Sequence, residues 1–131
     1  MSIQRINPEG LHATPGYHHV TIVSAGRVAH LAGQCPLDVT GAVVDGGFDE
    51  QVDQVVANSL VALAAVSATP EQVVRSVIYV VSADQAVLAA AWARFTSSPL
   101  APAFTTASTL LGVARLGYKG QLVELDLTAA L

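Results

Sequence analysis

An α+β fold, with one β-sheet and two helices packed on one of its faces, is predicted from the order of the short segments and from the composition of the chain. Turn signals divide the sequence into elements in the order β-β-β-α-β-α-β-β. Two helices are too few to cover both faces of a sheet. Hydrophobic residues make up 52% of the chain and charged residues 12%, a composition that excludes disorder and indicates a large buried surface.

The first part of the chain is expected to form strands. Residues 3–6 would be an edge strand, and residues 18–24 and 27–32 flank Ala25-Gly26, a spacing that predicts a β-hairpin with a two-residue loop. Because side chains alternate along a strand, this hairpin would have two different faces. The face interpreted as core carries Val20, Ile22, Ala29 and Leu31. The mixed face, which suits a cavity wall or a subunit interface, carries His19, Thr21, Val23, Val28, His30 and Ala32.

Two helices are predicted in the middle of the chain. Along residues 49–67, apolar residues recur at three- and four-residue spacing. This stripe consists of Val52, Val56, Leu60 or Ser59, Leu63 and Val66. Ser82, followed three residues later by Gln85, forms a capping box that predicts a second helix over residues 83–97.

Residues 73–81, 104–113 and 121–129 predict the remaining strands. The first of them follows Thr69-Pro70-Glu71-Gln72, a capping motif with proline at the first helical position, which predicts a brief turn. In the last strand, the residues expected to face the core are Val123, Leu125 and Leu127. Those expected to face the other way are Leu122, Glu124, Asp126 and Thr128.

Length, charge and cysteine content narrow the class of protein. A chain of 131 residues favours one domain, residues 1–131. The net charge of −4 gives no electrostatic case for a nucleic-acid partner. No apolar stretch reaches the roughly 18 residues that predict a membrane span, and the N-terminus has no signal-peptide core. The single Cys35 excludes an internal disulfide and a thiolate zinc cluster within one chain, so the cytoplasm is the expected compartment.

The apolar composition also predicts an oligomer. A chain this apolar, with one face of its sheet bare, would aggregate unless sheets of other subunits covered that face. We therefore expect a domain that assembles with further copies and carries a cavity at their interface.

Four histidines are the first candidates for a metal site. His18 and His19 are adjacent on a strand, so their side chains point to opposite faces and cannot bind one metal together. His19 and His30 would share a face diagonally across the predicted hairpin, but no third ligand is evident, so no metal is predicted. The alternative is that these two, with His12 and His18, line a partly solvated cavity or interface.

Cys35 and Glu124 are candidates for catalysis. Cys35 would need a nearby cation or helix start to act as a nucleophile, and the sequence indicates neither, which favours a small buried side chain. Glu124 lies in a strand of an apolar chain, where a carboxylate must be solvated, paired or functional. As a general acid or base it would be poised by burial and by Asp126, two residues on. The alternative is an ordinary solvent-facing acid or a partner of Arg115 or Arg75.

Several stretches, in this order and spacing, together resemble the reactive-intermediate deaminase (Rid, or YjgF) family over nearly the whole chain. They are Gly16-Tyr17-His18-His19, residues 32–38 (AGQCPLD), Asn58-Ser59-Leu60, Val77-Ile78-Tyr79-Val80, Trp92-Ala93-Arg94-Phe95, residues 112–116 (GVARL) and Leu122-Val123-Glu124-Leu125. The resemblance implies a chorismate-mutase-like fold with one mixed sheet, and a homotrimer whose sheets form a central barrel. Ligand clefts would lie between the subunits.

The resemblance also implies an activity and a set of site residues. The best-known activity of the family is hydrolysis of reactive enamines and imines to a keto acid and ammonia, without a metal or organic cofactor. Tyr17 corresponds to a tyrosine of the cleft, and Glu124 to a carboxylate that positions or activates water. By the same correspondence, the ligand contacts would be Tyr17, Ala32, Gly33, Trp92, Ser108 and Thr109.

The chain departs from the deaminating members of the family at three positions of the site. Ser108 stands where those members have the arginine that holds the substrate carboxylate. Ala32 replaces the serine of a Ser-Gly-Gln stretch, and Ala89 takes the place of an asparagine. The sequence therefore indicates a subgroup of the family that lacks the arginine.

Three hypotheses for the function follow. The first is a cofactor-free hydrolase or tautomerase of small imines, enamines or related carbonyl compounds, in which Glu124 steers water and Tyr17 and Ser108 contact the ligand. The second is a non-catalytic trimer that binds a small metabolite or a partner protein. A ribonuclease or translation inhibitor is the third, and the acidic balance of the chain disfavours it.

Overall fold

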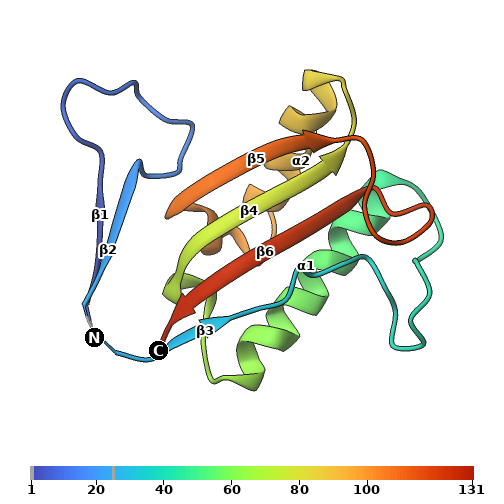
Figure 1. Cartoon of the computed structure of the whole chain (residues 1–131), viewed down its shortest axis with the longest axis horizontal. Helices are drawn as coiled ribbons and strands as arrows, with labels where there is room; N and C mark the ends of the chain where they lie inside the picture. The colour runs from blue at the N-terminus through green and yellow to red at the C-terminus, as the bar shows by residue number, and fades with distance from the viewer. Residues whose placement is uncertain (1, 25) are drawn as a thin grey trace.

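The computed structural model describes residues 2–24 and 26–131 and contains one four-stranded sheet, a separate two-stranded ribbon and two helices (Figure 1). The elements follow the predicted order. They are β1 (Ile3–Ile6), β2 (Val20–Val23), β3 (Val28–His30), α1 (Phe48–Ala65), β4 (Val73–Val81), α2 (Gln85–Thr96), β5 (Ala107–Val113) and β6 (Val123–Ala130). Single 3-10 turns, Pro70–Gln72 and Ala101–Phe104, precede β4 and β5. The predicted α+β class is confirmed.

The main sheet has the strand order β3-β6-β4-β5, in which β4 and β5 are parallel and the other neighbours antiparallel. The chain passes from β4 to β5 through α2, because parallel strands cannot be joined by a tight turn. Both helices lie on the same face of the sheet (Figure 1). The sheet is thus mixed, and its second face has no cover within the described part of one chain.

The hydrophobic core lies between this sheet and the helices. The alternation predicted for the last strand is confirmed, because Val123, Leu125 and Leu127 are buried. Phe95 of α2 and Phe104 of the second 3-10 turn are both buried in this core, with ring centroids 5.3 Å apart. The core therefore joins the helix layer to the middle of the sheet.

The predicted pairing of residues 18–24 with residues 27–32 is wrong. β2 pairs with β1 in antiparallel register, from Ile3 opposite Val23 onward, whereas β3 pairs with the end of β6. The short β3 gains a buried partner strand on β6, which a local two-residue hairpin cannot offer. Of the expected loop, Ala25 lies outside the described residues.

This pairing changes which side chains are buried. Val20 and Ile22, expected in the core, are 41% and 45% exposed on the ribbon. Ala29 and Leu31 do pack against the core, as predicted. The local pattern therefore identified strands correctly but assigned the wrong neighbour to β2.

Several helix and strand boundaries also differ from the prediction, most clearly at the starts of α2 and β5. The cap of α2 is Asp84, whose carboxylate accepts from the backbone N–H of Ala86 at 2.8 Å, while the Ser82 hydroxyl accepts from the N–H of Asp84 instead. β5 begins at Ala107 because the preceding proline-containing segment forms a 3-10 turn. The capping motif before β4 is confirmed by the bond from the Thr69 N–H to Gln72 Oε1 at 2.9 Å.

The bare face of the sheet is mixed in character. Arg75, Val77 and Tyr79 of β4 alternate with buried residues and share this face with Glu124 and Asp126 of β6. In the described part of the chain, no helix combines the length and apolarity that crossing a membrane requires.

Candidate functional site

The carboxylate of Glu124 lies half-buried on the bare face of β6 and is held by two side chains. Its Oε1 accepts from the Cys35 thiol, with Sγ 3.2 Å away, and from Gln121 Nε2 at 3.1 Å. Gln121 is itself buried. Its side chain also donates to the Val123 carbonyl and accepts from the Tyr118 N–H. The orientation of this carboxylate is therefore determined by the fold and not by solvent.

Gly33 lies directly against the same carboxylate. A Cβ at this position would be 2.2 Å from Glu124 Oε2. Any residue other than glycine would therefore force either the backbone at position 33 or the carboxylate to move. The segment that contains Gly33 is held against β6 by two backbone hydrogen bonds between Gln34 and Leu125, of 2.7 and 3.0 Å. Ala32, the neighbouring predicted contact, is exposed, and its carbonyl accepts from Gln34 Nε2.

The Cys35 thiol is not set up as a nucleophile. Burial, and then the hydrogen bond and negative charge of Glu124, raise its pKa from 9.0 to about 11. At neutral pH it is therefore protonated, and the thiolate is the reactive species. Its loop is secured by Asn58 of α1, which donates to the carbonyls of Cys35 and Leu37 at 3.0 and 2.9 Å. We call Gly33, Cys35, Gln121 and Glu124 the Glu124 group.

A second set of predicted residues gathers elsewhere, beside β5 and α2. Tyr17, Trp92, Ser108 and Thr109 line a hollow of about 480 Å³. The other residues that line it are Pro15, Ala89 and Leu110. The rings of Tyr17 and Trp92 meet edge to face, with centroids 6.1 Å apart. We call the four predicted residues the Tyr17 group.

The hydroxyls of this group are already engaged within the chain. Ser76 Oγ lies 2.6 Å from Ser108 Oγ, which donates to the Thr106 carbonyl at 3.0 Å. Thr109 Oγ1 accepts from the Arg75 guanidinium at 2.6 Å. Among the described residues, none of those lining the hollow carries a positive charge. The hollow therefore offers aromatic surface and hydroxyl oxygens, and the cation Arg75 is bound to one of these oxygens without lining the hollow.

Next to Tyr17 the structure reveals a cluster that local sequence patterns do not indicate. His12 Nε2 lies 3.0 Å from the Tyr17 hydroxyl, and His19 Nε2 lies 2.9 Å from the His12 carbonyl. The prediction that His19 shares a face with His30 is wrong, because β2 and β3 do not pair. His18 contacts the Thr105 carbonyl. Searched over its described residues, the chain contains no cluster of three His, Cys, Asp or Glu that could hold a metal ion.

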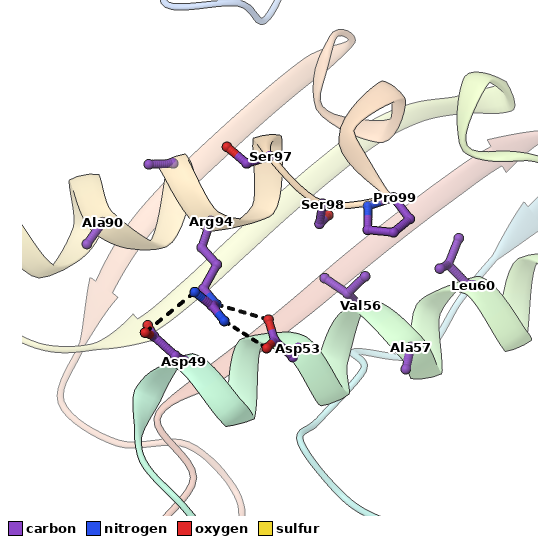
Figure 2. Close-up of a pocket in the computed structure, with 11 residues that line it drawn as sticks. Asp49, Asp53, Val56, Ala57, Leu60, Ala90, Arg94, Ser97, Ser98 and Pro99 are labelled. Atoms are coloured by element: carbon purple, nitrogen blue, oxygen red, sulfur yellow. Dashed lines mark hydrogen bonds and ion pairs between the residues drawn. The ribbon is translucent and has the colours of Figure 1, made fainter.

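A further hollow, of about 790 Å³, lies between α1 and α2 and contains none of the predicted site residues (Figure 2). Arg94 points into it and is bound by both oxygens of Asp53, at 2.9 and 2.8 Å. Asp49 lies 3.5 Å from the same guanidinium. The Arg94 guanidinium is therefore paired within the chain, and the rest of the lining consists of small and apolar side chains and two serines.

The Glu124 group and the Tyr17 group do not share a hollow in one chain. Gly33 and Cys35 line a separate depression of about 340 Å³, bordered by Asp38, Asn58 and Tyr118. No residue that lines it also lines the hollow of the Tyr17 group. Within one chain, the two groups therefore border different depressions.

Comparisons with known proteins place this architecture. The family described as Endoribonuclease L-PSP matches residues 9–131. The crystal structure of YyfB from Yersinia pestis, a Rid-family protein of unknown function, is 34% identical, with a TM-score of 0.89 over 100% of both chains. RidA from an Antarctic Psychrobacter is 26% identical, with a TM-score of 0.64 over 98% of this chain and 99% of that one.

More distant structures share the fold alone. Rv2704 from Mycobacterium tuberculosis, a member of the YjgF/YER057c/UK114 family, is 20% identical, with a TM-score of 0.64 over 99% of this chain and 100% of that one. No curated protein matches the sequence. The α+β architecture is thus the chorismate-mutase-like fold of Rid proteins. The chain belongs to the Rid family, described also as Endoribonuclease L-PSP.

Proposed function

We propose that this protein is a cofactor-free hydrolase or tautomerase of small imines, enamines or related carbonyl compounds. The observation that carries the proposal is the Glu124 carboxylate, whose Oε1 is held by Cys35 and Gln121 while Oε2 faces Gly33. Such a carboxylate can orient water or accept a proton without reorganising.

The site is proposed to be completed between subunits of a homotrimer. Two observations support this: the bare face of the sheet, and the separation of the Glu124 group from the Tyr17 group within one chain. A barrel of three sheets would cover the bare face and bring the Tyr17 group of one subunit toward the Glu124 group of the next. Light scattering that gives a monomer mass at micromolar concentration would contradict this assembly.

Imine hydrolysis in this cleft would need no group beyond water and protein. Glu124 accepts a proton from water as the water oxygen bonds to the carbon of a protonated imine, which gives a neutral carbinolamine. Protonated Glu124 then returns this proton to the nitrogen and the C–N bond breaks. The carbinolamine hydroxyl proton passes through Glu124 to the released ammonia, so a carbonyl compound and ammonium leave. The Tyr17 hydroxyl, held by His12, would contact the ligand.

The proposed substrates either lack a carboxylate or carry one that the cleft binds only weakly. A charged hydrogen bond contributes about 1.5–3 kcal/mol, so loss of a bidentate arginine clamp is costly. Ser108 cannot replace it, because its hydroxyl proton is given to the Thr106 carbonyl. Ala32 and Ala89 remove two further polar contacts from the family pattern, which makes the cleft less polar.

An imine-decay assay tests the proposal. Imines would be generated by an amino-acid oxidase, which leaves a carboxylate, and by an amine oxidase, which does not. We expect the protein to accelerate decay of the second kind more. Glu124→Gln should lower the rate by at least about 100-fold, the size of a typical general acid–base contribution. Asp126→Asn, on the same face two residues on, is the matched control.

The outcomes separate this proposal from its alternatives. No acceleration with either kind of imine removes the hydrolase, and an unchanged rate in Glu124→Gln removes the role of Glu124. A non-catalytic metabolite-binding trimer is favoured instead by the hydroxyls that are already engaged, and thermal stabilisation by a ligand without turnover would support it. The family description names ribonuclease activity, but this chain has ten acidic and six basic residues, and we expect RNA to stay intact.

A further inference from the structure

The two oxygens of the Glu124 carboxylate have different surroundings. Oε1 accepts from the Cys35 thiol and from Gln121 Nε2. In the part of the chain that the structure describes, Oε2 accepts no hydrogen bond and lies over Gly33, where the absence of a side chain leaves room for it. Only Oε2 is therefore free to meet water or a ligand.

The thiol proton has two acceptors within reach. Cys35 Sγ is 3.2 Å from Glu124 Oε1 and 3.6 Å from the Gly33 carbonyl. A thiol has one proton and is a weak donor, so it goes to the nearer and negatively charged oxygen. Cys35 and Gln121 together thus hold Oε1 from two sides.

We propose that Cys35 is a positioning residue for Glu124, whose thiol occupies Oε1 and so leaves Oε2 as the single reactive oxygen. This inference rests on the proposed function, because it assigns the thiol a role in that same site. Alanine in place of Cys35 would free Oε1 on one side and let the carboxylate rotate. Serine would keep a donor of similar size in place.

Other ionisable groups border this pair and must be separated from it. Asp126 and Tyr79 share the bare face with Glu124, and Asp38 and Tyr118 border the depression beside Cys35. None of them is hydrogen-bonded to the thiol or to the Glu124 carboxylate in the described part of the chain. Asp126→Asn is therefore the matched control, since it removes a nearby charge without touching the contact.

Thiol alkylation tests the contact without any turnover. The rate of iodoacetamide reaction with Cys35 would be measured from pH 7 to 11.5 in the full-length protein. In Glu124→Gln the midpoint should fall by about half a unit to one unit, which raises the rate at pH 9 by about 3- to 10-fold. This midpoint should stay above the ordinary pKa of a cysteine thiol, because the Cys35 thiol remains partly buried in the variant. An unchanged midpoint, or an equal shift in Asp126→Asn, would overturn the contact.

Turnover of the imine substrate tests the consequence of the contact. Cys35→Ala should lower kcat by about tenfold with little change in KM, the loss expected for one hydrogen bond to a charged group. Cys35→Ser should restore most of the rate. Equal rates in all three proteins, or equal losses in both variants with unchanged melting temperatures, would reject a positioning role. If the wild-type protein turns nothing over while alkylation behaves as expected, the proposed function fails and the contact stands.

Discussion

The Glu124 group and the Tyr17 group are held together by different forces. Polar contacts and a steric fit arrange the first: two donors on Oε1, and a glycine that admits the carboxylate. Aromatic packing arranges the second, since Trp92 lies between Tyr17 and Phe104 with ring centroids 6.1 and 5.9 Å away. A preorganised carboxylate suits chemistry, whereas an aromatic hollow with engaged hydroxyls suits binding an apolar body.

Truncation of Trp92 is expected to have the largest effect on stability. Trp92→Ala should lower the free energy of unfolding by about 2–4 kcal/mol, because two edge-to-face ring contacts and part of the packing below α2 are lost. Urea unfolding measures it. Trp92→Phe keeps one ring in place and should cost less than about 1.5 kcal/mol. The pH midpoint of Cys35 alkylation should be unaffected in both variants, because the thiol is hydrogen-bonded to Glu124 of its own subunit. A shift of this midpoint would show that the contact depends on Trp92.

A side chain added at Gly33 tests the steric fit of the Glu124 group. Gly33→Ala puts a Cβ 2.2 Å from Glu124 Oε2, so the loop or the carboxylate must move. We expect a loss of about 1–3 kcal/mol in the free energy of unfolding, together with loss of turnover. Gly117→Ala is the matched control, because nothing lies within 4 Å of an added Cβ there. Full imine hydrolysis by Gly33→Ala would contradict the fit described for Glu124.

The smallest effect concerns alkaline pH. The pKa of Cys35 is raised to about 11 in the folded chain, so unfolded chains lose the thiol proton first as the pH climbs above 9. The stability that the thiol contributes is complete below pH 9 and is lost between pH 9 and 11. Urea unfolding with reductant present should therefore show a steeper alkaline decline for the wild-type protein than for Cys35→Ala. Parallel declines would mean that the thiol is not perturbed.

Some elements were predictable from local sequence to the residue. β4 spans Val73–Val81 as expected, because a β-branched run is bounded by a capping motif before it and Ser82 after it. The burial of alternate residues in β6 followed from period-two spacing alone. The pairing of β2 failed because a two-residue loop predicts only the nearest partner, and β3 found its partner about 100 residues away at Ala130.

The candidate site divides in the same way. Glu124 was identifiable as a charged residue in an apolar strand, and Tyr17 by resemblance to a family. The contact between Cys35 and Glu124 joins residues 89 positions apart, and no local pattern indicates it. The bond from His12 to Tyr17 was missed for a different reason, because irregular loops have no periodicity to read.

The sequence by itself determined the number, order and type of the elements, since these depend on spacing and capping within a few residues. Its apolar composition predicts that further copies cover one sheet face, and this stays a prediction. Only the tertiary structure decided that β3 pairs with β6, that Gly33 admits the carboxylate, and that the thiol meets Oε1. Those contacts depend on which distant strands become neighbours, and the free energy that selects them comes from burying the whole sheet against its helices.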